Sequence, residues 1–157
     1  MLNPGQAMAA VRAQAATPLP ARLNMAAQVC DDRAEATPER VAIIDLTGST
    51  HDTVSYARLR GMADGLARDL AARGVVPGDR VGVLRNQGAW CAAAHIAVWK
   101  IGAISIPLFK LFMHDALAAR IGDADARVVV TDDDGVDLLS GIATHPVVPE
   151  ALDLDDT

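Results

Sequence analysis

The sequence predicts an α/β fold in which helices cover a mainly parallel sheet, and three observations support this. Hydrophobic residues make up 51% of the chain but aromatic residues only 3%, so Ala, Val, Leu and Ile must build the core. From Tyr56 onward, helical and strand patterns alternate along the chain. Alternation of this kind requires crossover connections, which join parallel strands and place helices over the sheet. The length of 157 residues suits one domain of ordinary size.

The two ends of the chain differ in composition from its centre. Residues 1–20 are rich in Ala, Pro and Gln and lack the continuous apolar stretch of a signal peptide, so we expect a flexible tail. Residues 21–145 are expected to form the folded part. Residues 146–157 become acidic and are expected to fray.

The first half of the folded part is predicted to contain two helices around a β-hairpin. Residues 24–34 are a helix with Asn24 as N-cap and with Met25, Val29 and Cys30 on its inner face. The hairpin consists of a strand at 41–46, a turn at 47–50 and a returning arm at 51–55.

The clearest helix covers residues 56–73, since its apolar residues recur at steps of three and four. Ser55 is placed as its N-cap and Gly74 as a left-handed C-cap. The predicted apolar stripe consists of Leu59, Met62, Ala63, Leu66 and Leu70.

The second half alternates between strands and helices. The helix at 87–101 is apolar nearly all round, so we expect it to be buried on several sides. The other predicted elements are core strands at 80–84, 103–108 and 126–130, a short helix at 114–121 and one more helix at 133–141.

Charge and cysteine usage exclude several function classes. The net charge of −6 and the scattered arginines are unlike a nucleic-acid footprint. Cys30 and Cys91 have no metal-ligand spacing, so we expect buried free thiols and a reducing, cytoplasmic setting. The longest apolar run, 89–101, is shorter than the roughly 20 residues that span a bilayer.

No motif for phosphate or metal binding emerges from the residues themselves. The turn at 85–88 lies between a strand and a helix but has one glycine and no Lys or Ser partner, so a plain helix start is expected. Asp132, Asp133 and Asp134 follow a strand end and have the oxygen ligands that Mg²⁺ prefers. We expect instead a solvated turn that caps the next helix, because no further ligand accompanies them.

The four histidines show no metal-ligand spacing within one element. His51 is expected on the hairpin surface and His95 as a hydrogen-bonded core residue. His114 is expected in the first turn of its helix, and His145 in a loop. The sequence therefore predicts no catalytic residue and no metal ligand.

Several short motifs occur in a fixed order between Pro20 and Asp132. They are PARLNMA at 20–26, VSYARL at 54–59, GV at 74–75, GDRV at 78–81 and WKIGAISIPL at 99–108. Together they resemble the amino-terminal region of the adenylate-forming enzymes, the AMP-dependent synthetases and ligases. The likeness is greatest to acyl-CoA synthetases of the acetyl and medium-chain type.

This resemblance implies descent from a ligase without the ligase chemistry. The family makes an acyl-adenylate from a carboxylate and ATP with Mg²⁺, and then transfers the acyl group to CoA. Its reactive groups lie on a Ser/Thr/Gly-rich loop ending in Lys-Gly, an aromatic-Gly segment with Thr-Glu, a ribose-binding Asp and a Lys on a mobile domain. None of these motifs occurs in the 157 residues. We therefore expect an inactive fragment that binds none of ATP, Mg²⁺ or CoA.

The chain also departs from the family pattern. Arg58 stands where the family has the Glu of a capping box, so the cap should be weaker by a few tenths to about 1 kcal/mol. Acidic residues at 133–137 stand where arginines of the acetyl type hold CoA phosphate. Lys110, beside Leu111, lies where a loop of medium-chain relatives reaches toward CoA. It is the one candidate on the CoA side, with a plain surface lysine as the favoured alternative.

Two other functions stay open. The apolar helix around 90–99 would seek cover, so the chain could be an interaction or dimerisation module that binds itself or the remainder of a split ligase. A small complete α/β domain of unrelated function would instead have protected sheet edges and its own pocket.

Overall fold

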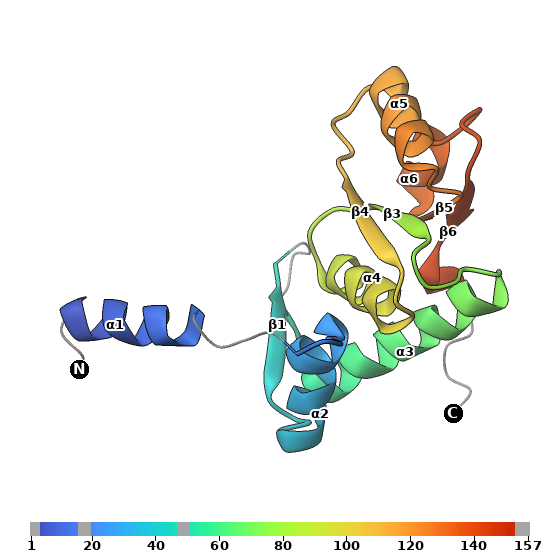
Figure 1. Cartoon of the computed structure of the whole chain (residues 1–157). Helices are drawn as coiled ribbons and strands as arrows, with labels where there is room; N and C mark the ends of the chain where they lie inside the picture. Colours follow the sequence, from blue (N-terminus) through green and yellow to red (C-terminus); the bar gives the residue numbers. More distant parts are fainter. Residues whose placement is uncertain (1–3, 16–19, 47–50, 153–157) are drawn as a thin grey trace.

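The computed structural model describes residues 4–15, 20–46 and 51–152 (Figure 1). The elements in chain order are α1 (Pro4–Ala15), the π-helical turn η1 (Ala27–Asp31), α2 (Asp32–Ala36), β1 (Val41–Asp45), β2 (Asp52–Ser55), α3 (Tyr56–Ala72), β3 (Arg80–Leu84), α4 (Ala89–Lys100), β4 (Ile104–Leu108), α5 (His114–Ala124), β5 (Val128–Thr131), α6 (Asp133–Leu138), β6 (His145–Val147) and the 3₁₀ turn η2 (Pro149–Ala151).

The predicted parallel sheet is confirmed. Its strands lie in the order β4-β3-β5-β6, and every neighbouring pair is parallel. The buried strands β3 and β5 occupy the centre. Residues of α3 and α4 form one core cluster with the sheet, and residues of α5 and α6 form a second (Figure 1). The hairpin of β1 and β2 is antiparallel, as predicted, and forms a separate two-stranded sheet.

Helix α3 follows the sequence prediction closely. The Ser55 hydroxyl accepts a hydrogen bond from the backbone N–H of Arg58 at 3.3 Å, and Gly74 has a φ of +87° past the helix end. The apolar stripe faces inward, with Leu66 and Leu70 fully buried. Helix α4 is at least half-buried on every side, as its composition predicted.

A largely buried lysine joins the helices beside this core. Lys100, the last residue of α4, forms an ion pair with Asp31 and a second one with Asp64 at 2.8 Å. Burial disfavours the charged amine, but hydrogen bonds to the two carboxylates outweigh it and raise the pKa of Lys100. The three residues tie η1, α3 and α4 together.

The helix predicted at 24–34 exists, and of the three residues assigned to its inner face Cys30 is buried but Met25 and Val29 are not. The Asn24 side chain caps it by accepting a hydrogen bond from the Ala26 N–H at 3.0 Å. The buried residues are Ala26, Cys30 and Ala34, whereas Met25 and Val29 are exposed. This helix packs closely on α3, and close packing selects the small side chains over the bulky ones.

Both chain ends contain structure that the sequence did not predict. Within the expected tail, Pro4–Ala15 forms α1, which Figure 1 shows extending away from the sheet. His145, expected in a loop, begins strand β6, and Val147 and Pro149 are buried behind it. The folded part therefore continues past residue 145, and the expected frayed end at 146–157 is wrong as far as Leu152.

Some predicted elements differ in position or extent. The strand expected in the core at 103–108 is β4, which lies at one side of the described sheet and leaves Ile104 half-exposed. Helix α5 runs past 121 to Ala124, and α6 ends earlier than expected, at Leu138. The turn at 47–50 and residues 153–157 lie outside the described residues. None of the described helices is both long and apolar enough to span a bilayer.

Candidate functional site

Chain segments that leave β3, β4 and β5 meet at the carboxyl edge of the sheet, which is where open α/β sheets place ligands. Arg85 follows β3, Lys110 follows β4 by two residues and Asp132 follows β5. Sequence analysis had singled out the segment of each of these residues. The structure brings all three to this one edge.

The Arg85 side chain links neighbouring segments of the fold. Its side chain is only 8% exposed, and its guanidinium donates a hydrogen bond to the Thr131 carbonyl oxygen at 2.5 Å. Both terminal nitrogens also bind the carboxylate of Glu150 on η2. Sequence analysis missed Glu150, because it lay in the segment expected to fray. The pair holds η2 against the ends of β3 and β5.

Lys110 is not the plain surface lysine that the sequence favoured. Its side chain is 12% exposed, and its Nζ lies 2.5 Å from Asp132 Oδ1 and 3.9 Å from Asp134 Oδ2. Burial would raise the pKa of Asp132, but the ionic hydrogen bond from Lys110 and the amide of Gly135 outweigh it and lower that pKa. A role for Lys110 at CoA stays a prediction, and it would require this ion pair to open.

The aspartates at 132–134 form the predicted capping turn. Asp132 accepts a hydrogen bond from the Gly135 N–H at 3.0 Å and caps α6. Asp134 points into solvent. Across residues 4–15, 20–46 and 51–152, no His, Cys, Asp or Glu residues are grouped to hold a metal ion.

The turn at 85–88 is the helix start that was expected. Helix α4 begins at Ala89, whose N–H donates a hydrogen bond to Asp45 Oδ2 at 3.0 Å, so a carboxylate from β1 caps a distant helix. The sequence carried no signal for that contact. A pocket of about 280 Å³ lies here. It is lined by Asp45, Arg85, Asn86, Gln87, Gly88, Ala89, Trp90, Cys91, Asp132 and Glu150.

The histidines are dispersed over the molecule. His51 is exposed beside the hairpin and His114 opens α5, both as predicted. His95 is half-buried and stacks on Trp99 with ring centroids 5.9 Å apart, and burial lowers its pKa. Its ring makes no hydrogen bond within the described structure, so that part of the prediction was wrong.

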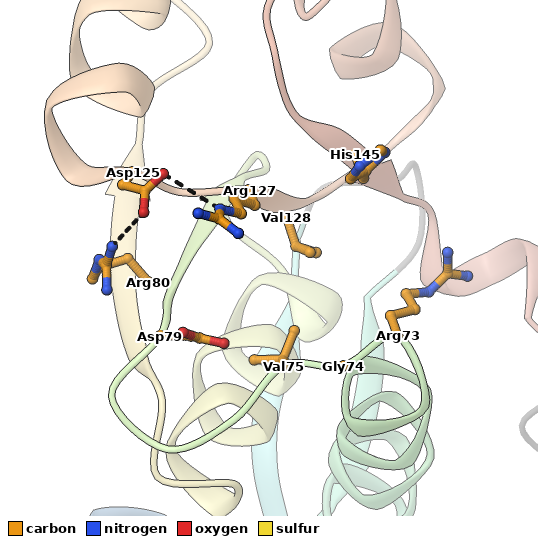
Figure 2. A pocket seen from close by; sticks show the side chains of 9 residues that line it. All are labelled: Arg73, Gly74, Val75, Asp79, Arg80, Asp125, Arg127, Val128 and His145. Atoms are coloured by element: carbon orange, nitrogen blue, oxygen red, sulfur yellow. Dashed lines mark hydrogen bonds and ion pairs between the residues drawn. The ribbon is translucent and has the colours of Figure 1, made fainter.

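A second pocket, of about 380 Å³, opens at the opposite, amino edge of the sheet (Figure 2). Each of its three arginines lies close to a carboxylate. Arg80 pairs with Asp125 at 3.0 Å, Arg127 approaches the same carboxylate at 3.5 Å and Arg73 pairs with Asp69 at 2.6 Å. Asp125 is thus shared by two arginines, and the lining of this pocket contains three arginines and two aspartates.

The described residues at the carboxyl edge do not fit a bound polyphosphate. ATP and CoA need cations or a glycine-rich loop for their phosphates. Here Arg85 is bound by Glu150 and Lys110 by Asp132.

Comparison with known proteins places these features in a family. The model of the AMP-binding enzyme family matches residues 30–156. Acetyl-coenzyme A synthetase of Streptomyces coelicolor is 39% identical over 134 residues, covering 83% of this chain and 20% of the relative. An acyl-CoA synthetase structure from Brucella canis superposes with a TM-score of 0.75 at 28% identity, covering 88% of this chain and 26% of that one.

A further likeness concerns the fold alone. The amino-terminal subdomain of NpsA from Klebsiella oxytoca matches with a TM-score of 0.70 at 23% identity, covering 82% of this chain and 32% of that one.

The chain spans about a fifth of the length of the curated relatives it matches. As its motifs predicted, the chain belongs to the AMP-binding enzyme family and corresponds to a fragment of such an enzyme.

Proposed function

We propose that this chain is the amino-terminal part of an AMP-forming carboxylate–CoA ligase, and that it has no ligase activity by itself. Its likeness to acetyl-coenzyme A synthetases over a fifth of their length supports this proposal. The observation that carries it is that the cations at the carboxyl edge of the sheet are already paired. Arg85 and Lys110, the cations nearest the strand ends, are both held in internal ion pairs.

In this proposal the chain supplies structure, while other parts of the ligase supply the reacting groups. A group that binds phosphate or transfers a proton must be able to reach the substrate. Arg85 and Lys110 are largely buried and paired, and the phosphate-loop sequence ending in Lys-Gly is absent from the 157 residues. The 157-residue chain would therefore bind none of ATP, Mg²⁺ or CoA. Its buried free thiols, Cys30 and Cys91, suit a reducing cytoplasm.

An ATP–pyrophosphate exchange assay tests the proposal. The purified chain is incubated with ATP, Mg²⁺, labelled pyrophosphate and a panel of short and medium-chain carboxylates. We expect exchange no greater than that of a protein-free blank, while acetyl-coenzyme A synthetase of Streptomyces coelicolor serves as the positive control. Carboxylate-dependent exchange by the chain alone would refute the claim of inactivity.

A second candidate function is a non-catalytic interaction or dimerisation module, which includes one half of a split ligase. It is favoured by large apolar side chains that remain exposed, such as Leu111 and Met113. Light scattering together with an apolar dye tests this second candidate. A monomer that binds no dye would argue against the interaction module.

A further inference from the structure

The pocket at the amino edge of the sheet collects positive charge in an acidic chain. We call it the amino-edge pocket, and the residues that line it are those labelled in Figure 2. Arg73 comes from the end of α3, Arg80 from the start of β3 and Arg127 from the residue before β5. With the two aspartates of the lining, these three arginines leave a formal charge of +1, whereas the whole chain carries −6. A positive cavity in an acidic protein attracts anions.

The two aspartates of the lining already have partners. Asp125 Oδ2 accepts a hydrogen bond from Arg80 at 3.0 Å, and Asp125 Oδ1 lies 3.5 Å from Arg127 Nε. Asp79 accepts a hydrogen bond from the Val76 N–H at 2.9 Å. The hydrogen-bonding capacity that remains in the pocket therefore lies on the arginines.

Arg73 and Arg127 are each held through one nitrogen and leave their outer nitrogens open. Arg73 Nε donates a hydrogen bond to Asp69 at 2.6 Å, and Arg127 Nε donates one to Asp125. Among residues 4–15, 20–46 and 51–152, the terminal nitrogens of these two guanidinium groups find no hydrogen-bond acceptor. The planar fork of a guanidinium matches the two oxygens of a carboxylate. The pocket therefore offers two sets of donors, each of which can hold one carboxylate.

Two valines give the pocket an apolar floor between these arginines. Val75 and Val128 are each only 8% exposed, and Figure 2 shows them between Arg73 and Arg127. A short methylene chain can pack on the valines, and the removal of its apolar surface from water is favourable. The cavity of about 380 Å³ has room for a small molecule of this shape.

The end of α3 disfavours a polyphosphate at the same place. Helix α3 ends at Ala72 with Arg73 as its C-cap, so its carbonyl groups and the negative end of its dipole face this edge. Polyphosphate sites use instead the amino end of a helix and a glycine-rich loop. The pocket therefore suits two separate carboxylates better than the dense charge of a polyphosphate.

We propose that the amino-edge pocket binds a small aliphatic dicarboxylate, with one carboxylate on Arg73 and the other on Arg127. Succinate is a simple probe of this class. The site is independent of the proposed ligase role, because it lies at the edge opposite the strand ends that are followed by Arg85 and Lys110.

Amide NMR spectra of the isotope-labelled chain, titrated with succinate at constant ionic strength, test the site. We expect saturable shifts at residues 73–75 and 125–128. Acetate should bind at least tenfold more weakly, because it has one carboxylate and can reach only one guanidinium. Pyrophosphate should also bind more weakly than succinate. Shifts that do not saturate or that lie elsewhere, acetate binding within tenfold of succinate, or pyrophosphate binding at least as tight as succinate overturns the proposal.

Paired variants locate the binding in the two arginines. One variant carries Arg73→Gln with Arg127→Gln, and the control carries Arg58→Gln with Arg68→Gln, which removes the same charge from exposed positions of α3. We expect succinate affinity to fall at least tenfold in the pocket variant and less than twofold in the control. A pocket variant that binds succinate as tightly as the control overturns the proposal.

A conservative pair separates the shape of the guanidinium from its charge. Arg73→Lys with Arg127→Lys keeps both charges but loses the fork, so succinate affinity should fall at least threefold. The fold should persist, because the Arg73 and Arg127 side chains are 41% and 82% exposed. This pair also decides the matter if the glutamine variant does not fold. Unchanged affinity in the lysine pair overturns the proposal.

Discussion

The α3–α4 layer and the loop between β4 and α5, residues 109–113, contain similar apolar residues in opposite environments. Leu66 and Leu70 of α3 are fully buried, and charged residues nearby are paired around Lys100. Leu111 and Met113 of the loop are 78% and 79% exposed to solvent. Burial gives the apolar residues of the first region most of their stabilising effect, and the exposed residues of the loop contribute little to the stability of the fold.

Truncation of one leucine in each region gives the largest contrast. Leu66→Ala should lower the free energy of unfolding by about 3 kcal/mol, because it leaves a cavity in a close-packed core. Leu111→Ala should change it by less than about 0.5 kcal/mol, because its side chain is mostly in solvent already. Urea unfolding of both variants measures this, and similar losses in the two would contradict the comparison.

Removal of the buried cation should be the next largest effect. Lys100→Met leaves Asp31 and Asp64 close together without a counter-charge, and we expect a loss of about 2 kcal/mol. This is less than for a fully buried pair, because both carboxylates are partly exposed. Adding Asp31→Asn and Asp64→Asn to Lys100→Met should restore at least half of the loss. No recovery in thermal or urea unfolding would show that the charges are not the cause.

Two glycines should respond in opposite directions to Ala. A Cβ on Gly82, in the central strand β3, would lie 2.9 Å from Val129 Cγ2 and 3.0 Å from Leu108 Cδ1. Overpacking of this kind costs about 1–3 kcal/mol. A Cβ on Gly61 meets nothing within 4 Å, and Ala is the better helix former by about 0.5–1 kcal/mol. Stabilisation by Gly82→Ala would contradict the packing described for the sheet.

The smallest effect should depend on pH. The pKa of Asp132 is lowered in the folded chain, so its ionised form stabilises the fold above its unfolded pKa of about 3.9. That contribution is lost as the pH falls through the lower, folded pKa. Asp132→Asn should therefore cost about 1 kcal/mol at pH 7 and less below pH ~4.

A neighbouring variant controls for general charge effects. Asp134→Asn removes the same charge from an exposed side chain, 3.9 Å from Lys110. It should change the free energy of unfolding by less than about 0.5 kcal/mol at either pH. Equal losses for the two variants would refute the specific pairing of Lys110 with Asp132.

The fold was predictable wherever one element carried its own signal. The stripe and caps of α3 and the apolar composition of α4 gave their boundaries to within a few residues. Strand β6 has only three residues and contains Pro146, so it resembles a loop in the sequence. Its assignment depends on pairing with β5, which is a tertiary contact.

The carboxyl edge was harder to predict, because its contacts join residues far apart in the chain. The turn at 85–88 and the aspartates were identified from strand ends. The partners were not, since Glu150 lies 65 residues from Arg85 and Asp45 lies 44 residues from Ala89. Short-range patterns contain no information about such pairs. For the same reason Lys110 was singled out by the family resemblance, but neither its partner Asp132 nor the low exposure of its side chain was predicted.

The central claim is that this chain provides structure to a ligase whose reacting groups lie elsewhere. The most direct test is ATP–pyrophosphate exchange with acetate, measured on the isolated chain and on a chimera in which the chain replaces the aligned segment of the Streptomyces coelicolor synthetase. The account predicts no exchange by the isolated chain and acetate-dependent exchange by the chimera. Exchange by the isolated chain, or a folded chimera without exchange, would contradict it.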